Sequence, residues 1–187
     1  MKKLLLSAVL AASFVALSAN AATSTGTITI KGQVVSSTCN VAVNGSQSPT
    51  ITLPTYDTNA LAAVNASAGW TPVTMALTGC TAVSNLTSNT VFPYFTGSNI
   101  DTTTGYLKNA TGAGNSNVQV AFSTSQSLAG ALTLQSASGA QGAGSVALPT
   151  TGTANLSFTY YAGYVAATAA ATAGAVNTTV QYALNYQ

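Results

Sequence analysis

The stretch GAVNTTVQYALNYQ, residues 174–187, carries the most regular pattern in the chain. From residue 176 onward, bulky or β-branched residues occupy every even position: Val176, Thr178, Val180, Tyr182, Leu184 and Tyr186. Small or polar residues occupy the odd positions. A period of two predicts a half-buried β-strand with one apolar and one polar face. Since this strand runs to the end of the chain, it needs a partner strand in its own sheet or on another chain.

The first 21 residues have the pattern of a secretory signal peptide. Two lysines precede an apolar run from Leu4 to Leu17, and the small-residue sequence Ala19-Asn20-Ala21 follows. The run is shorter than the roughly 20 apolar residues that a transmembrane helix needs. We therefore expect residues 1–21 to be removed on export, and a mature chain that starts at Ala22 and has no membrane segment.

The mature chain carries almost no charge. The sequence holds four Lys or Arg, two Asp or Glu and no His, so that Lys31, Lys108, Asp57 and Asp101 remain after residues 1–21 are removed. Charged residues normally make up about a quarter of a soluble domain, and a net charge near zero favours association. The composition predicts a subunit of an assembly or a secreted domain with a neutral Ser/Thr surface. It argues against nucleic acid as a partner, because phosphate binding needs clustered Lys or Arg.

The same residues leave little for catalysis or metal binding. General acid–base catalysis uses titratable groups with tuned pKa values, and Asp57 and Asp101 both lie in turn-like sequences, where a short carboxylate bonds its own backbone. The sequence Asp101-Thr-Thr-Thr-Gly105 is a weak match to a calcium loop, which needs more carboxylates. Without His no Ser/His/Asp triad can form, and no Cys cluster suits zinc. We therefore expect no enzyme, no metal and no cofactor.

The sequence has two cysteines, Cys39 and Cys80. In an exported chain a low, even number of cysteines favours a disulfide. The chain-entropy account gives a loop of this size a stabilisation of about 4 kcal/mol. Free thiols and a two-ligand metal site are the alternatives.

Short alternating segments between the two ends predict an all-β fold. They are residues 32–43, 50–54, 73–77, 91–95, 118–122, 131–134, 146–148 and 156–160. Stretches rich in Ser, Gly, Asn and Thr separate them, as in a sandwich or a barrel. Residues 60–64 are expected to form one helical turn. Pro93 predicts an edge position for the strand over 91–95, because proline cannot donate to a neighbouring strand.

The segment from Ala22 to Ile30 alternates again, with Thr between Gly26, Ile28 and Ile30. Fully extended it spans roughly 30 Å, and its apolar face continues through Gly32 to Val34. Glycine weakens an ordinary strand interior, but it suits a place where another backbone or a bulky side chain comes close. We interpret the segment as an extended amphipathic arm. A plain first strand and a leader without structure are the alternatives.

Three features together resemble the type 1-like pilins of the chaperone–usher pathway. The first is the sequence Lys31-Gly-Gln-Val-Val-Ser-Ser-Thr-Cys-Asn-Val41. The second is Ile51-Thr-Leu-Pro54 followed by Leu77-Thr-Gly-Cys80. The third is the C-terminus, where a glycine stands fourteenth from the end and a tyrosine is penultimate. The resemblance covers the mature chain and is most specific at the two ends and the cysteine pair.

The resemblance implies an incomplete immunoglobulin-like sandwich of six strands, which lacks the seventh strand and has a groove along its core. It divides the chain into a signal peptide (1–21), a donor-strand arm (22–31) and an incomplete pilin domain (32–187). In this family a periplasmic chaperone first inserts a strand into the groove, and at the outer-membrane usher the arm of the next subunit replaces it. An unpaired strand edge is a template for another strand. A head-to-tail joint that does not close gives a filament.

Site residues follow from the resemblance by position. The donor strand is expected to use Ser24, Gly26, Ile28 and Ile30, with Gly26 as the glycine of the family's donor arm. The acceptor groove and chaperone contact are expected to use Gly174, Val176, Val180, Tyr182, Leu184, Tyr186 and Gln187. The Gln187 carboxylate would be held by basic residues of the chaperone. Many family arms carry larger apolar residues where this chain has Thr23, Ser24 and Thr25.

These expectations describe a structural subunit that polymerises into an extracellular fimbria by donor-strand exchange and supports adhesion. Its partners would be other pilin subunits, a periplasmic chaperone and an outer-membrane usher. The alternatives are a minor or adaptor pilin, a coat or biofilm protein of related fold, and a monomeric secreted sandwich that binds carbohydrate or a surface. In the last case Trp70, Tyr160, Tyr161 and Tyr164 would be stacking aromatics.

Overall fold

The computed structural model describes residues 29–30, 33–34 and 39–187. The chain divides into two compact units, residues 1–34 and 35–187. The expected signal peptide, residues 1–21, and the expected donor residues Ser24, Gly26 and Ile28 lie outside the described residues. Within the described part, no helix has the length and apolar character needed to cross a bilayer.

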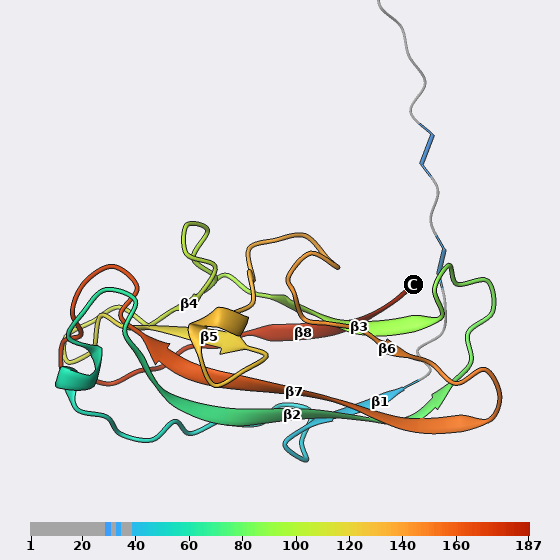
Figure 1. Ribbon diagram of the computed structural model, residues 1–187, viewed down its shortest axis with the longest axis horizontal. Helices are drawn as coiled ribbons and strands as arrows, with labels where there is room; N and C mark the ends of the chain where they lie inside the picture. Colours follow the sequence, from blue (N-terminus) through green and yellow to red (C-terminus); the bar gives the residue numbers. More distant parts are fainter. Residues whose placement is uncertain (1–28, 31–32, 35–38) are drawn as a thin grey trace, which may run out of the picture. The chain divides into compact units, whose positions relative to one another are not determined.

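The second unit contains two antiparallel β-sheets, whose strands run along the length of the ribbon in Figure 1. One sheet has the order β1-β2-β7-β5-β4 and the other β6-β3-β8. The strands are β1 (Asn40–Val43), β2 (Ser67–Thr81), β3 (Thr90–Thr96), β4 (Leu107–Lys108), β5 (Gln119–Ser123), β6 (Val146–Ala147), β7 (Thr153–Val165) and β8 (Gln181–Tyr186). Two short 3-10 helices, η1 (Thr58–Leu61) and η2 (Leu128–Gly130), complete the elements of the described part.

The all-β prediction is confirmed, with differences in detail. The described part has eight strands rather than six, because β4 and β6 are two-residue pieces. The helical turn expected at residues 60–64 begins earlier, at Thr58, where the Asp57 carboxylate accepts a hydrogen bond from the Asn59 backbone N–H at 2.8 Å. The segment 50–54 is not a strand, and neither is 131–134. Both alternate in sequence, but neither pairs in a sheet ladder.

The long β2–β7 pair carries the core. Val73, Met75 and Leu77 point inward from β2 and are buried, whereas the intervening Thr74 is exposed. This alternation is what a strand with one covered face requires. The inward residues join side chains from β3, β5 and β7 in one apolar cluster.

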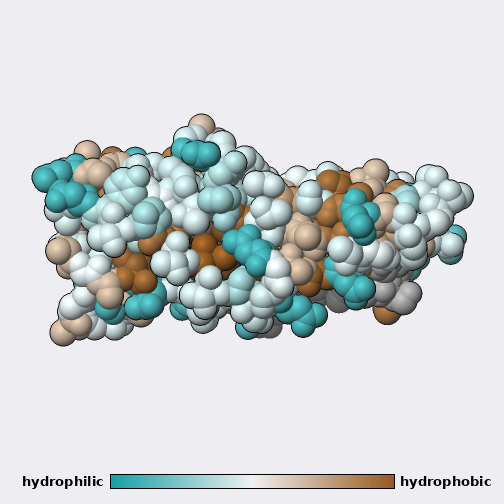
Figure 2. All heavy atoms as spheres, turned by 90° about the horizontal axis from the view of Figure 1, so that it is seen from below, coloured by the Kyte–Doolittle hydropathy of each residue, from teal (hydrophilic) through white to brown (hydrophobic). Residues whose placement is uncertain are grey.

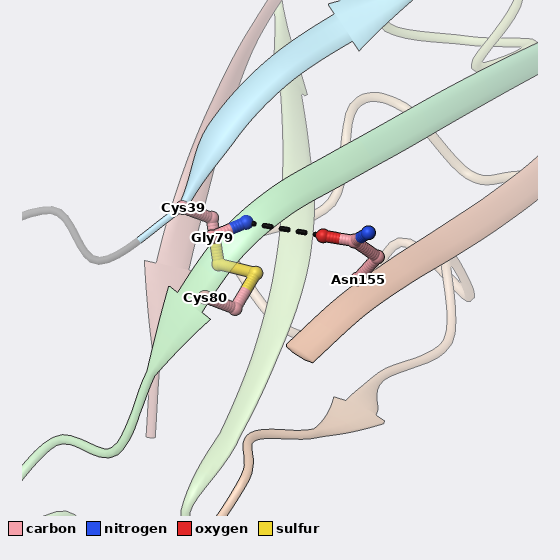
Figure 3. The surroundings of a disulfide bond; sticks show 4 residues. All are labelled: Cys39, Gly79, Cys80 and Asn155. Atoms are coloured by element: carbon pink, nitrogen blue, oxygen red, sulfur yellow. Dashed lines mark hydrogen bonds between the residues drawn. A yellow bond between two sulfur atoms is a disulfide. The ribbon is translucent and has the colours of Figure 1, made fainter. Parts of the chain in front are cut away.

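A disulfide joins Cys39, which precedes β1, to Cys80 in β2, as the sequence predicts (Figure 3). The two Cα atoms are 4.2 Å apart. Next to it the register between β2 and β7 shifts, and the Gly79 backbone N–H donates to the Asn155 side-chain oxygen at 3.2 Å. The disulfide therefore ties the start of the sandwich to its longest strand pair.

The edge position predicted from Pro93 is wrong, because β3 lies between β6 and β8. Thr90 and Gln187 exchange backbone hydrogen bonds, so the residues of β3 that bond β8 are Thr90, Phe92 and every second residue after them. Pro93 falls between these positions. The nitrogen that lacks a hydrogen points away from β8, and no bond of the β3–β8 ladder is lost.

On the other side of β3 a side chain takes the place of a strand. Gln141 is buried, with 2% of its surface exposed. Its side-chain oxygen accepts from the Phe95 N–H at 2.9 Å, and its side-chain nitrogen donates to the carbonyl oxygens of Phe95 and Leu134, both at 2.7 Å. The amide thereby satisfies backbone groups of β3 beyond the end of β6.

We predict that Gln141→Leu lowers the free energy of unfolding by roughly 2–5 kcal/mol, because the buried N–H and carbonyl groups of Phe95 and Leu134 lose their partners. Urea unfolding followed by fluorescence measures the change. Gln126→Leu is the matched control, since Gln126 is exposed in the loop before η2. An equal loss of stability in the two variants would contradict the assignment.

Candidate functional site

A groove of about 900 Å³ runs along the core of the second unit. One wall is formed by residues 47–53, which follow β1, and the other by residues 176–182, which lead into β8. Its floor consists of inward side chains from both sheets: Val73, Met75, Phe95, Leu107, Val120, Phe122, Tyr160 and Ala162. Apolar residues, shown in brown in Figure 2, also reach the surface on one face of the molecule.

The side chains along the groove walls are only half buried. On β3 the inward residues Val91 and Phe95 are 0% and 3% exposed. Their neighbours on β8 and in the two walls pack against the same cluster but keep part of their surface in solvent: Ile51, Leu53, Val176, Val180, Tyr182, Leu184 and Tyr186. The core is thus closed at β3 and open at the groove.

The outer edge of β8 presents backbone groups to the groove side. In the described part of the chain β8 pairs with β3 alone. Because hydrogen-bonded positions alternate along an antiparallel strand, Ala183 and Asn185 bond β3, and the N–H and C=O groups of Tyr182 and Leu184 point away from it. The pairing of Leu184 with Pro93 agrees with this alternation. The edge is therefore able to accept one more strand.

The groove lining is not purely apolar, and two of its hydroxyl groups have contrasting surroundings. The Tyr182 hydroxyl donates to the backbone carbonyl of Gln47 at 2.9 Å, which links the two walls. The Thr178 hydroxyl oxygen is buried and has no hydrogen-bond partner among the described residues. A buried hydroxyl without a partner costs roughly 1–3 kcal/mol.

The groove lining is electrically neutral at physiological pH. It contains no Asp, Glu, Lys, Arg or His, and burial raises the pKa of the phenols of Tyr160 and Tyr164 above their ordinary value. The Tyr160 hydroxyl donates to the Ala143 carbonyl at 2.6 Å. Such a lining suits apolar side chains and a backbone, and it offers no proton-transfer group that works near neutral pH.

The aspartate turn expected at Asp101 lies outside this lining. The Asp101 carboxylate accepts hydrogen bonds from the backbone N–H groups of Thr103 and Thr104 and from the Gln119 side chain. These bonds, led by the one from Thr103, lower the pKa of Asp101. No group of three or more His, Cys, Asp or Glu residues that could hold a metal occurs in the described residues.

The structure brings most of the expected acceptor residues together. Val176, Val180 and Tyr182 line the groove, and Leu184 and Tyr186 continue the same inward face of β8. Gln187 closes the strand through two backbone hydrogen bonds with Thr90, at 2.9 and 3.0 Å.

Gly174 is the exception among these residues, because it lies outside the groove lining. Its backbone rests against the loop of residues 114–116, and a Cβ atom there would come within 2.5 Å of the Asn115 carbonyl carbon. Close approach of two backbones is the physical reason for glycine at this position.

Sequence reasoning missed one wall of the groove. The sequence predicts a strand at residues 50–54, whereas residues 47–53 form a wall of the groove without pairing in a sheet of the described part. Thr178 belongs to the period-two pattern but is not among the expected acceptor residues, because it is polar. The structure places it in the groove lining. On the donor side, the described arm residue Ile30 is 90% exposed, and Val34, which follows the arm, is 98% exposed.

The two-sheet architecture is that of pilus subunits. A chain from a chaperone–usher pilus aligns with a TM-score of 0.58 at 18% sequence identity, over 88% of this chain and 97% of that one. The P pilus rod subunit PapA aligns with a TM-score of 0.54 at 17% identity, over 81% of this chain and 100% of that one. At these identities the likeness concerns the fold.

The sequence comparisons then identify the family. A family model described as "Fimbrial protein" matches residues 28–187. The F17 fimbrial protein of Escherichia coli is 39% identical over 163 residues, which cover 87% of each chain. The major fimbrial subunit SMF-1 of Stenotrophomonas maltophilia strain K279a is 40% identical over 178 residues, or 91% of this chain and 96% of that one. The chain belongs to the fimbrial protein family and is a structural pilin subunit.

We predict that Gly174→Ala lowers the free energy of unfolding by roughly 1–3 kcal/mol, because the added methyl group overpacks against the backbone of residues 114–116. Ala173→Ser, at the exposed neighbouring position, should change it by less than about 0.5 kcal/mol. Urea unfolding of both variants measures the difference. A Gly174→Ala variant as stable as the control would show that the two backbones do not meet closely.

Proposed function

We propose that this pilin polymerises by donor-strand exchange, in which the arm of one copy, residues 22–31, fills the groove of the next copy. The observation that carries the proposal is the contrast between β3 and β8: inward residues are fully buried on β3 and half buried on β8. An inserted strand would cover the exposed part of these side chains. It would also pair with the outward backbone groups of Tyr182 and Leu184.

The arm has the chemistry that the groove requires. Ile28 and Ile30 share one face with Gly26 and Gly32, and Ile30 is almost fully exposed before any partner binds. Burying one such side chain contributes about 1.5–3 kcal/mol. The groove lining has no charged side chain, and the one charged side chain of the arm, Lys31, stands on the face opposite Ile28 and Ile30, so the apolar face brings no ionic side chain to desolvate when the two meet.

The proposed function includes the route of export and assembly. Residues 1–21 direct export to the periplasm, where a chaperone occupies the groove first and an outer-membrane usher then exchanges it for the next subunit. The finished fimbria is extracellular, and its subunits have no catalytic role. Because each copy gives an arm to one neighbour and accepts an arm from the other, the assembly grows as an open filament.

A sugar-binding module with stacking aromatics is the less favoured function. Tyr160 is buried and bonded to Ala143, and Tyr164 belongs to the groove. The Trp70 ring lies on the Cα of Gly163, where an added Cβ would come within 2.6 Å of ring atoms. Tyr160 is buried, and Trp70, Tyr161 and Tyr164 are half buried, so none of the four presents a fully exposed ring for stacking.

Deletion of residues 22–30 is expected to abolish fimbriae while the subunit is still exported. Electron microscopy of the cells and SDS-resistant ladders of sheared material measure assembly. Ladders that persist after the deletion would contradict the donor role.

A matched pair of point variants makes the test sharper. Ile30→Asp places a charge on the apolar face of the arm and should reduce polymer at least tenfold, since burying an unpaired carboxylate costs more than about 1.4 kcal/mol. Thr29→Asp places the same charge on the opposite face and should assemble close to normally. Equal effects of the two substitutions would mean that the arm does not insert by one face.

A further inference from the structure

We propose that the Tyr182 hydroxyl is a latch across the groove, which must release before a donor strand can insert and which therefore limits the rate of strand exchange. This inference rests on the proposed function. It concerns the hydroxyl group, whereas the expected role of Tyr182 uses only its apolar ring.

The latch is a single hydrogen bond between two distant parts of the chain. Tyr182 lies at the start of β8, and its hydroxyl donates to the backbone carbonyl of Gln47 in the opposite wall at 2.9 Å, across 135 positions of the sequence. Among the described residues, no backbone–backbone hydrogen bond joins the wall of residues 47–53 to that of residues 176–182. The side-chain bond is thus the hydrogen bond that joins the two walls in the described part of the chain.

Insertion of a strand competes with this bond directly. A strand that lies between the walls pairs with the outward edge of β8 at Tyr182, and its other edge faces the backbone of residues 47–53. The competition is for space, since a carbonyl oxygen can accept two hydrogen bonds: the phenol that reaches Gln47 lies across the space between the walls, which the new strand has to occupy. The phenol therefore has to leave Gln47 before the strand can pass this point.

The other phenols of the groove are placed differently. Tyr160 donates to Ala143, which is not part of either wall. Tyr164 lines the groove without a hydrogen bond that crosses it in the described structure. Gln47 is exposed, so water competes for its carbonyl and the latch opens reversibly. A hydrogen bond of this kind has a modest net value, which corresponds to a change of about 2- to 12-fold in a rate.

The test uses the mature chain refolded from urea and a synthetic peptide of residues 22–36 with a fluorescent label. The insertion rate is measured by stopped-flow anisotropy for the wild type, for Tyr182→Phe and for Tyr94→Phe. Tyr94 is a half-buried tyrosine on β3 that does not line the groove, so its variant controls for the loss of a phenol. We expect Tyr182→Phe to take up the peptide about 2- to 12-fold faster, and Tyr94→Phe to match the wild type.

Each outcome decides one of the two proposals. If the wild type takes up the peptide and Tyr182→Phe does so at the same rate or more slowly, the latch is overturned and strand exchange stands. If the wild type takes up no peptide, the proposed function fails and the latch fails with it.

A second measurement does not depend on the folding of Tyr182→Phe. Fluorotyrosine at position 182 of the otherwise unchanged chain reports the surroundings of the phenol by ¹⁹F NMR. The latch requires its signal to shift on peptide insertion, and a signal that stays unchanged overturns the proposal.

Discussion

The one-sided pairing of β8 is the constraint on which the rest of the structure depends. Its odd residues bond β3, so the backbone groups of Tyr182 and Leu184 face the open side of the sheet. Their side chains point into the core but are half buried, because no strand covers them from that side. The groove is the space that this arrangement leaves between β8 and the wall of residues 47–53. An edge of this kind is a template for another strand.

The three-stranded sheet satisfies the backbone of β3 beyond β6 and the outer side of β8 in different ways. Beyond the end of β6, the buried side chain of Gln141 takes the place of a strand and bonds Phe95 on both its N–H and its carbonyl. Across the groove beside β8, in the described part of the chain, the Tyr182–Gln47 hydrogen bond joins the two walls. One edge is closed permanently from within the chain, and the other is held by a bond that water can replace. The near absence of charge in the sequence fits this second edge, since neither the groove lining nor the apolar face of the arm has an ionic side chain to desolvate.

Sequence patterns predicted the local elements better than they predicted which elements lie next to one another. The period of two over residues 176–186 predicted the inward face, and the cysteine pair predicted the disulfide, because both signals are local or compositional. The strand itself is shorter than expected, since β8 spans Gln181–Tyr186 and residues 176–180 pair with no strand of the described part. The central position of β3 was not predictable from Pro93, since the cost of proline depends on which side its nitrogen faces, and that is fixed only by the register with Gln187. The wall of residues 47–53 and the Tyr182–Gln47 bond depend on contacts between distant positions, which no local period reports.

Amide hydrogen exchange of β8 tests the central claim most directly. In the lone mature chain the amide of Ala183, which bonds β3, should exchange slowly, while those of Tyr182 and Leu184 should exchange much faster. All three should be protected once the peptide of residues 22–36 is bound, or within assembled fimbriae. Equal and strong protection of Tyr182, Ala183 and Leu184 in the lone chain would contradict the account, because it would mean that the strand already has partners on both sides.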